Sequence, residues 1–139
     1  MRRRVTIQPL FDYKLLFKSL LCKSDNMSFI MSNSGRTSLD ISLKSVERHN
    51  KYKTILVPDL ICSEIMPIIQ KHKLNIVFYN IDHELNPDLN FIEYHLKNEA
   101  CILLLINYFG KASDWKSIFS LKEKYDFLTL EDNAHSLFG

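Results

Sequence analysis

The stretch Ala100-Cys-Ile-Leu-Leu-Leu-Ile106 decides the fold class of this chain, because it is the most apolar run in the sequence. A helix that crosses a membrane needs about 20 apolar residues, so the run is too short for one. A short, continuously apolar segment is instead typical of a strand that is buried on both faces of a parallel sheet. The run therefore predicts an interior strand of an α/β domain.

Segments of the same kind recur on either side of this run and alternate with segments that have the apolar spacing of helices. We expect strands at residues 54–57, 75–79, 101–106 and 127–130, and a short extended segment at 28–31. We expect helices at 11–21, from a start near 36–38, and at 61–72, 88–97 and 113–124. This alternation predicts a three-layer α/β/α fold around a mostly parallel sheet.

The composition fits one folded domain over residues 1–139. The chain has 46% hydrophobic and 24% charged residues, and no linker, repeat or low-complexity segment divides it. Its net charge of +2 is too small to indicate a nucleic-acid or membrane partner. The basic cluster Arg2-Arg3-Arg4 is most simply a solvated tail.

Two further features indicate a cytoplasmic protein. Lys14 and Lys18 interrupt the apolar residues near the start of the chain, so we expect no signal peptide. Cys22, Cys62 and Cys101 are odd in number and lack Cys-x-x-Cys spacing, so neither a disulfide framework nor a zinc site is indicated. We expect these cysteines to be buried free thiols.

An acidic segment, Glu131-Asp132-Asn133-Ala134-His135, directly follows the last predicted strand. Ligands of open α/β sheets bind outside the carboxyl ends of the strands, so a carboxylate and an imidazole here are candidate binding groups. The alternative is that Glu131 and Asp132 are solvated loop acids and that His135 caps a neighbouring element. Because the alternation stops at this loop with no helix after it, we expect the chain to be truncated.

A second candidate site is the segment Asn33-Ser34-Gly35-Arg36-Thr37-Ser38, where a glycine marks the turn into a helix. Unpaired N–H groups and the positive end of the helix dipole bind phosphate at such a place, and Arg36 and Thr37 can add to it. Taken alone, the segment favours the simpler interpretation that Ser34 or Thr37 caps the helix. It lacks the spacing of a Walker loop or a dinucleotide fingerprint.

Two other strand ends carry candidate residues. After residues 54–57 we expect Asp59 to cap the next helix and Cys62 to fill the core, since no motif places a histidine base beside this thiol. After residues 101–106, Tyr108 or Phe109 either lines a pocket or packs structurally, and packing is the favoured interpretation.

The order of these motifs resembles the first half of the large domain of the DegT/StrS-type sugar aminotransferases, which depend on pyridoxal phosphate (PLP) and belong to fold type I. The resemblance runs from about Ser32 to the end of the chain. Its motifs are Ser-Gly-Arg-x-Ser-Leu at 34–39, Val-Pro-Asp-x-x-Cys at 57–62, Phe-Tyr-Asn-Ile-Asp at 78–82, Tyr-Phe-Gly-Lys-x-x-Asp at 108–114, and Glu-Asp-x-Ala-His-Ser at 131–136.

The resemblance implies a role for four residues. The backbone amides of Arg36 and Thr37 would hold the cofactor phosphate, in agreement with the dipole argument. Asp132 would pair with the pyridine nitrogen and favour its protonated form, which makes the ring an electron sink. His135 would contact the ring hydroxyl and orient the ring.

The chain also departs from the family pattern. Cys62 stands where the family usually has an aromatic residue that stacks on the cofactor. The Schiff-base lysine of the family lies beyond the Glu-Asp-x-Ala-His segment, within a Ser-x-x-Lys pattern, and the lysines from Lys14 to Lys124 match no such pattern. We therefore expect a partial large domain, without its carboxyl-terminal part and small domain, that is inactive alone and has no catalytic residue of its own.

The resemblance implies that the parent enzyme transfers an amino group from an amino acid to a keto group of a nucleotide-activated sugar, for polysaccharide biosynthesis, as a homodimer. It leaves open a dehydratase on the same scaffold, in which histidine replaces the lysine. Two alternatives remain: a catalytically inactive truncated or regulatory family member, and an unrelated α/β domain of flavodoxin-like type that binds a phosphate ligand.

Overall fold

The structure is a computed structural model that describes residues 5–7 and 32–135. The described residues form one sheet of five strands with the order β1-β5-β4-β2-β3, and each neighbouring pair is parallel. The strands are β1 (Val5–Ile7), β2 (Thr54–Pro58), β3 (Asn75–Tyr79), β4 (Cys101–Ile106) and β5 (Leu128–Asp132). The predicted parallel sheet is confirmed.

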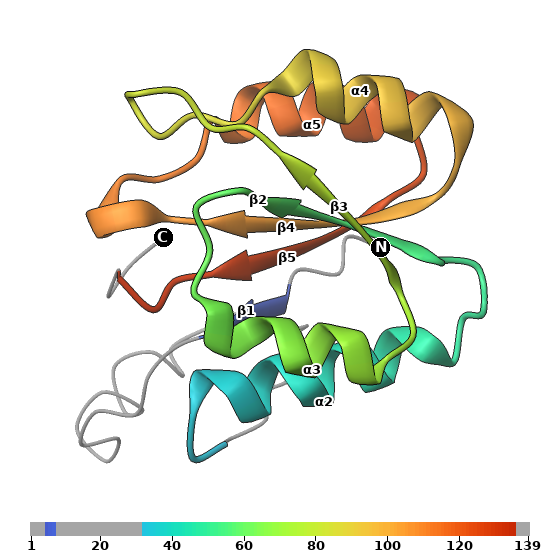
Figure 1. The fold of residues 1–139 in the computed structure, drawn as a ribbon. Coiled ribbons are helices and arrows are strands. Elements are labelled where there is room, and N and C mark those ends of the chain that lie inside the picture. The colour runs from blue at the N-terminus through green and yellow to red at the C-terminus, as the bar shows by residue number, and fades with distance from the viewer. Residues whose placement is uncertain (1–4, 8–31, 136–139) are drawn as a thin grey trace, which may run out of the picture.

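Helices cover both faces of this sheet. Figure 1 shows α2 (Gly35–Glu47) and α3 (Met66–Lys71) on one face, and α4 (Leu89–Asn98) and α5 (Trp115–Lys124) on the other. Two short 3-10 turns, η1 (Ser63–Ile65) and η2 (Tyr108–Gly110), follow the carboxyl ends of β2 and β4. The three-layer α/β/α arrangement is as predicted.

The apolar character of β2, β4 and β5 follows from this double cover, because successive strand residues point to opposite faces and both faces are buried there. Leu104 of β4 and Leu130 of β5 belong to a core cluster with Leu43 of α2. Leu105 of β4 belongs to a second cluster with Ile118 of α5. Two separate cores, one on each face of the sheet, therefore hold the layers together.

Aspartates set the starts of two helices. Asp88 accepts a hydrogen bond from the Phe91 N–H at 3.0 Å, and Asp114 accepts one from the Ser117 N–H at 3.2 Å. Each aspartate is therefore an N-cap that lies just outside its helix. For this reason α4 and α5 begin one and two residues later than predicted.

The segment after β2 differs more from the prediction. The expected helix at 61–72 is divided into η1 and the shorter α3, which has Pro67 in its first turn, where a missing N–H is tolerated. Asp59 does not cap a helix, because the chain bends at Asp59 and Leu60 and the next helical turn begins only at Ser63, so that prediction is wrong. Its backbone N–H instead donates to the Tyr79 carbonyl oxygen at 2.9 Å.

Other elements differ at the two ends of the chain. β5 extends to Asp132, beyond the predicted end at residue 130, because Glu131 and Asp132 pair with Leu105 and Ile106 of β4. Strand β1 was not predicted. The helix expected at 11–21 and the extended segment at 28–31 lie outside the described residues. No helix within residues 32–135 is long and apolar enough to cross a bilayer.

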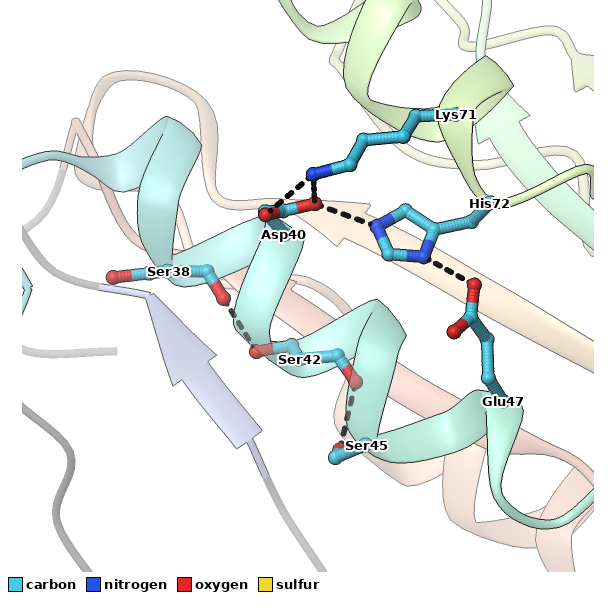
Figure 2. A network of polar contacts seen from close by, with 7 residues as sticks. All are labelled: Ser38, Asp40, Ser42, Ser45, Glu47, Lys71 and His72. Carbon is cyan, nitrogen blue, oxygen red and sulfur yellow. Dashed lines mark hydrogen bonds and ion pairs between the residues drawn. The ribbon is translucent and has the colours of Figure 1, made fainter.

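A buried histidine joins the two helices on one face of the sheet. His72, whose side chain is 4% exposed, places Nε2 2.8 Å from Asp40 Oδ1 and Nδ1 2.6 Å from Glu47 Oε1 (Figure 2). The Lys71 ammonium lies 3.0 Å from both Asp40 oxygens. Because both carboxylates come from α2 and their partners, Lys71 and His72, come from the end of α3, these contacts hold the two helices side by side.

Candidate functional site

Asp132 is the last residue of β5 and points to the face of the sheet that α2 and α3 cover. Side chains alternate along a strand, so Asp132 shares its face with Leu130, which packs in the α2 cluster. Its Oδ1 accepts a hydrogen bond from the Ala134 N–H at 2.8 Å. Within residues 32–135, no donor reaches its second oxygen, Oδ2.

Burial controls the charge of this carboxyl group. Loss of water around Asp132 raises its pKa above the ordinary value of 3.8. The hydrogen bond from Ala134 and the neighbouring His135 act in the opposite direction but do not compensate. A cationic group that approached Asp132 would lower this penalty, because opposite charge favours the ionised acid.

The start of α2 is a capped helix N-terminus. Ser34 is the N-cap, and its Oγ accepts a hydrogen bond from the Thr37 N–H at 3.2 Å. The capping interpretation of this segment is therefore correct, and Thr37 N–H already has a partner. Gly35 and Arg36 occupy the first two helical positions, where no carbonyl of the same helix is available to the N–H groups.

Side chains around this helix start form their own polar network. Ser32 Oγ lies 2.5 Å from Ser38 Oγ, and the Thr37 hydroxyl donates to Asn33 Oδ1 at 2.8 Å. The Arg36 guanidinium forms an exposed ion pair with Glu64 at 2.7 Å. The side chain of Arg36 is thus engaged with η1, and its backbone N–H is the part of the residue available at the helix start.

The structure brings the two predicted halves of the site to the same side of the molecule. The start of α2 and the carboxyl ends of the strands lie at the same end of the sheet (Figure 1). By strand alternation, Asp132 faces the layer that contains α2. His135 follows β5 at this end, and its exposed ring stacks on Phe109 with the ring centroids 5.6 Å apart. The cofactor role of the four residues stays a prediction; they are Arg36, Thr37, Asp132 and His135.

Other residues predicted near this edge have different environments. Cys62 is exposed, so the expectation that it fills the core is wrong, whereas Cys101 is buried as expected. Cys62 lies in the connection between β2 and η1, outside any strand or helix. Tyr108 is buried and its hydroxyl donates to the Leu60 carbonyl oxygen, so its role is structural packing. Phe109 does not pack in the core, since 80% of it is exposed.

The most buried polar residue at this edge, Asn107, was not among the predicted site residues. Asn107 is fully buried, and its side-chain amide donates to Glu131 Oε1 at 2.8 Å and to Asn133 Oδ1. Its Oδ1 accepts from the Ser113 N–H at 3.0 Å and from the Ser113 hydroxyl at 3.1 Å. The signal was a polar residue placed directly after the most apolar strand. Glu131 is also buried, so the interpretation of Glu131 as a solvated loop acid is wrong.

Comparisons with known proteins point to one family and one fold. The family model of the DegT/DnrJ/EryC1/StrS aminotransferase family matches residues 17–138. No curated protein matches the chain in sequence.

Three solved structures illustrate the similarity in fold. The E. coli GDP-4-keto-6-deoxy-D-mannose-3-dehydratase with bound hydrated PLP has a TM-score of 0.71 and 22% identity over 90% of this chain and 34% of its own. A GDP-4-keto-6-deoxymannose-3-dehydratase with a trapped PLP-glutamate geminal diamine gives 0.62 and 22%, over 70% and 27%. Aspartate aminotransferase from Saccharomyces cerevisiae cytoplasm gives 0.51 and 19%, over 68% and 26%. The chain spans about a third or less of the length of these structures.

Proposed function

Because this chain belongs to the DegT/DnrJ/EryC1/StrS aminotransferase family, we propose that it forms the cofactor-binding part of the large domain of a PLP-dependent enzyme. The proposed reaction of the whole protein is transfer of an amino group from an amino acid to a keto group of a nucleotide-activated sugar. The motif order had predicted this family from the sequence.

The placement of Asp132 carries the proposal. Its partly buried carboxylate ends β5 on the face covered by α2, and one of its oxygens meets no donor within residues 32–135. The start of α2, which offers the N–H groups of Gly35 and Arg36, lies at the same end of the sheet (Figure 1). Asp132, an acid with a raised pKa, suits the ring nitrogen of a ligand, and the N-terminus of α2 suits its phosphate.

Each residue would have one task toward the cofactor, which, when bound, supplies an electron sink for proton removal next to the amino group. Asp132 would hold a proton on the pyridine nitrogen. The start of α2 would bind the phosphate through N–H groups and the helix dipole. His135 would donate or accept one hydrogen bond at the hydroxyl of the cofactor ring. For this, the imidazole of His135 would have to move away from Phe109 or rotate against it.

Binding of PLP to the chain tests the proposal. Absorbance titration should give saturable binding to the wild type and weaker binding to Asp132→Asn. Asp126→Asn is the matched control, because Asp126 is an exposed aspartate at the opposite end of β5, where it pairs with Lys51. Equal binding by all three proteins would contradict the assignment of Asp132.

Turnover of the whole protein gives a second test. Asp132→Asn should slow the reaction by orders of magnitude, because the unprotonated ring loses its electron sink. His135→Ala should cost less, since a hydrogen bond contributes about 0.5–1.5 kcal/mol. A nearly silent Asp132→Asn combined with an inactive His135→Ala would show that the two roles are misassigned. Two of the similar structures are sugar dehydratases, so the assay should measure both aminated and dehydrated sugar products.

We further propose that the whole protein is a cytoplasmic homodimer. This expectation comes from the family resemblance. Sedimentation of the whole protein with and without PLP measures its oligomeric state, and a monomer under both conditions would contradict it.

A further inference from the structure

We propose that Asn107 determines which of two neighbouring acids, Glu131 or Asp132, faces α2, and that it is therefore a positioning residue for Asp132. The functional importance of which acid faces α2 rests on the proposed function, whereas the hydrogen bonds of Asn107 are independent of it. Within the described residues, the Asn107 side chain bonds Glu131, Asn133 and Ser113 and makes no hydrogen bond with the Asp132 carboxylate. It acts through the residues on either side of Asp132.

The two acids are adjacent on β5 and therefore point to opposite faces of the sheet. A slip of β5 by one residue would exchange them, so that Glu131 faced α2 and Asp132 faced α5. Leu130 packs in the core cluster on the α2 side and opposes this slip, but the two paired residues after it are both acids. At this strand end a polar contact can therefore add to the distinction between the two faces.

Asn107 supplies that contact. Glu131 and Asn133 alternate with Asp132, so both point to the side of the sheet opposite α2, and the Asn107 amide donates to each of them. The Asn107 backbone N–H also donates to the Asp132 carbonyl oxygen at 3.0 Å, which aligns the ends of β4 and β5. With its neighbours held on one face, Asp132 is directed to the other.

The orientation of the Asn107 amide is itself determined. Its oxygen accepts both the N–H and the hydroxyl of Ser113, so all four hydrogen-bonding positions of the amide are used. A flipped amide would place its NH₂ group against the Ser113 N–H and its oxygen against the carboxylate of Glu131. Ser113 therefore fixes the side on which the two donors lie.

Carboxyl titration by carbon-detected NMR, on the full chain without cofactor, tests this role. Asn107→Ala should lower the pKa of Asp132 toward its ordinary value, because a released strand end lets water reach the carboxylate. Thr54→Val is the matched control. Thr54 is equally buried, its hydroxyl bonds Glu99 at 2.7 Å, and it lies at the amino end of β2, so its loss should leave the Asp132 titration unchanged.

A second variant keeps the test decisive if Asn107→Ala does not fold. Ser113→Ala removes one of the two donors to Asn107 and leaves the backbone donor in place. It should move the Asp132 titration in the same direction by a smaller amount. An unchanged Asp132 titration in a folded Asn107→Ala, or in Ser113→Ala where the first variant is unfolded, would overturn the role of Asn107.

Titration with PLP separates this inference from the proposed function. Asn107→Ala and Asp132→Asn should each weaken PLP binding by about tenfold, the equivalent of one hydrogen bond. Weakening by Asp132→Asn alone would overturn the role of Asn107 and leave the proposed function in place. If neither variant changed PLP binding while Asn107→Ala still moved the Asp132 titration, the proposed function would fail and the positioning role would remain.

Discussion

Phe109 stacks on His135, with the two ring planes 17° from parallel and the centroids 5.6 Å apart. The contact joins the turn after β4 to the loop after β5, at the end of the sheet where Asp132 lies. Phe109 has a φ of 52°, in the left-handed region that bulky residues rarely adopt, and most of its ring is exposed. The left-handed conformation of Phe109 therefore costs backbone energy, although most of the residue is exposed.

Replacing Phe109 separates this backbone cost from the value of the stack. Phe109→Gly should be more stable to urea than Phe109→Ala by about 1 kcal/mol, because glycine adopts the left-handed conformation without a Cβ clash. Both variants lose the stack equally, so each serves as the control for the other. Equal stability of the two would show that the turn carries no strain.

Asp132→Asn should stabilise the cofactor-free chain at neutral pH. The folded pKa of Asp132 is raised by burial, so the protonated form favours folding and stability is lost as the pH rises above 3.8 through the folded value. The asparagine variant should lack this loss, which urea unfolding at a series of pH values measures. A variant that is less stable than the wild type at neutral pH would refute this account.

Asp82→Asn is the control with the opposite sign. The backbone and side chain of Asn86 donate to Asp82 and lower its pKa below 3.8. Its contribution to stability is therefore present above pH 3.8 and is lost as the pH falls below this value. Asp82→Asn should remove stability at neutral pH, whereas Asp132→Asn should add it.

His72→Leu should loosen α3 from α2. Each nitrogen of the buried ring lies within hydrogen-bond distance of a carboxylate (Figure 2). We expect a loss of about 1.5 kcal/mol in the free energy of unfolding, the lower value for hydrogen bonds to charged groups, because the partners are partly exposed. Lys71→Met removes the exposed cation of the same network and should cost less. A larger cost for Lys71→Met would contradict this ranking.

Ser34→Ala should destabilise the chain by about 1 kcal/mol, the usual cost of removing an N-cap. Ser45→Ala in the same helix is the control, because Ser45 is exposed and bonds the Ser42 carbonyl within the helix. Thermal unfolding of the two variants gives the comparison. If PLP competes for the Thr37 N–H, Ser34→Ala should lose less stability when PLP is bound.

The sequence by itself determined the layers of the fold. Continuous apolar runs such as 101–106 and the spacing of helical segments are local signals, and they predicted the parallel sheet and its two helical layers. Cap chemistry is also local, so Ser34 was identified as a candidate N-cap before the structure. The order of short motifs was sufficient to predict the family.

Only the tertiary structure decided which of two adjacent acids faces α2, although the family resemblance had already assigned Asp132 to the candidate site. Glu131 and Asp132 are adjacent and chemically alike, so their residue types alone do not show which of them points to which face of the sheet. Pairing of β5 with β4, with Ile106 opposite Asp132, sets the face to which each points. Asn107 holds that register through partners 24 and 26 positions away in the chain. Such contacts depend on how distant strands align, which the periodicity of a single segment does not encode.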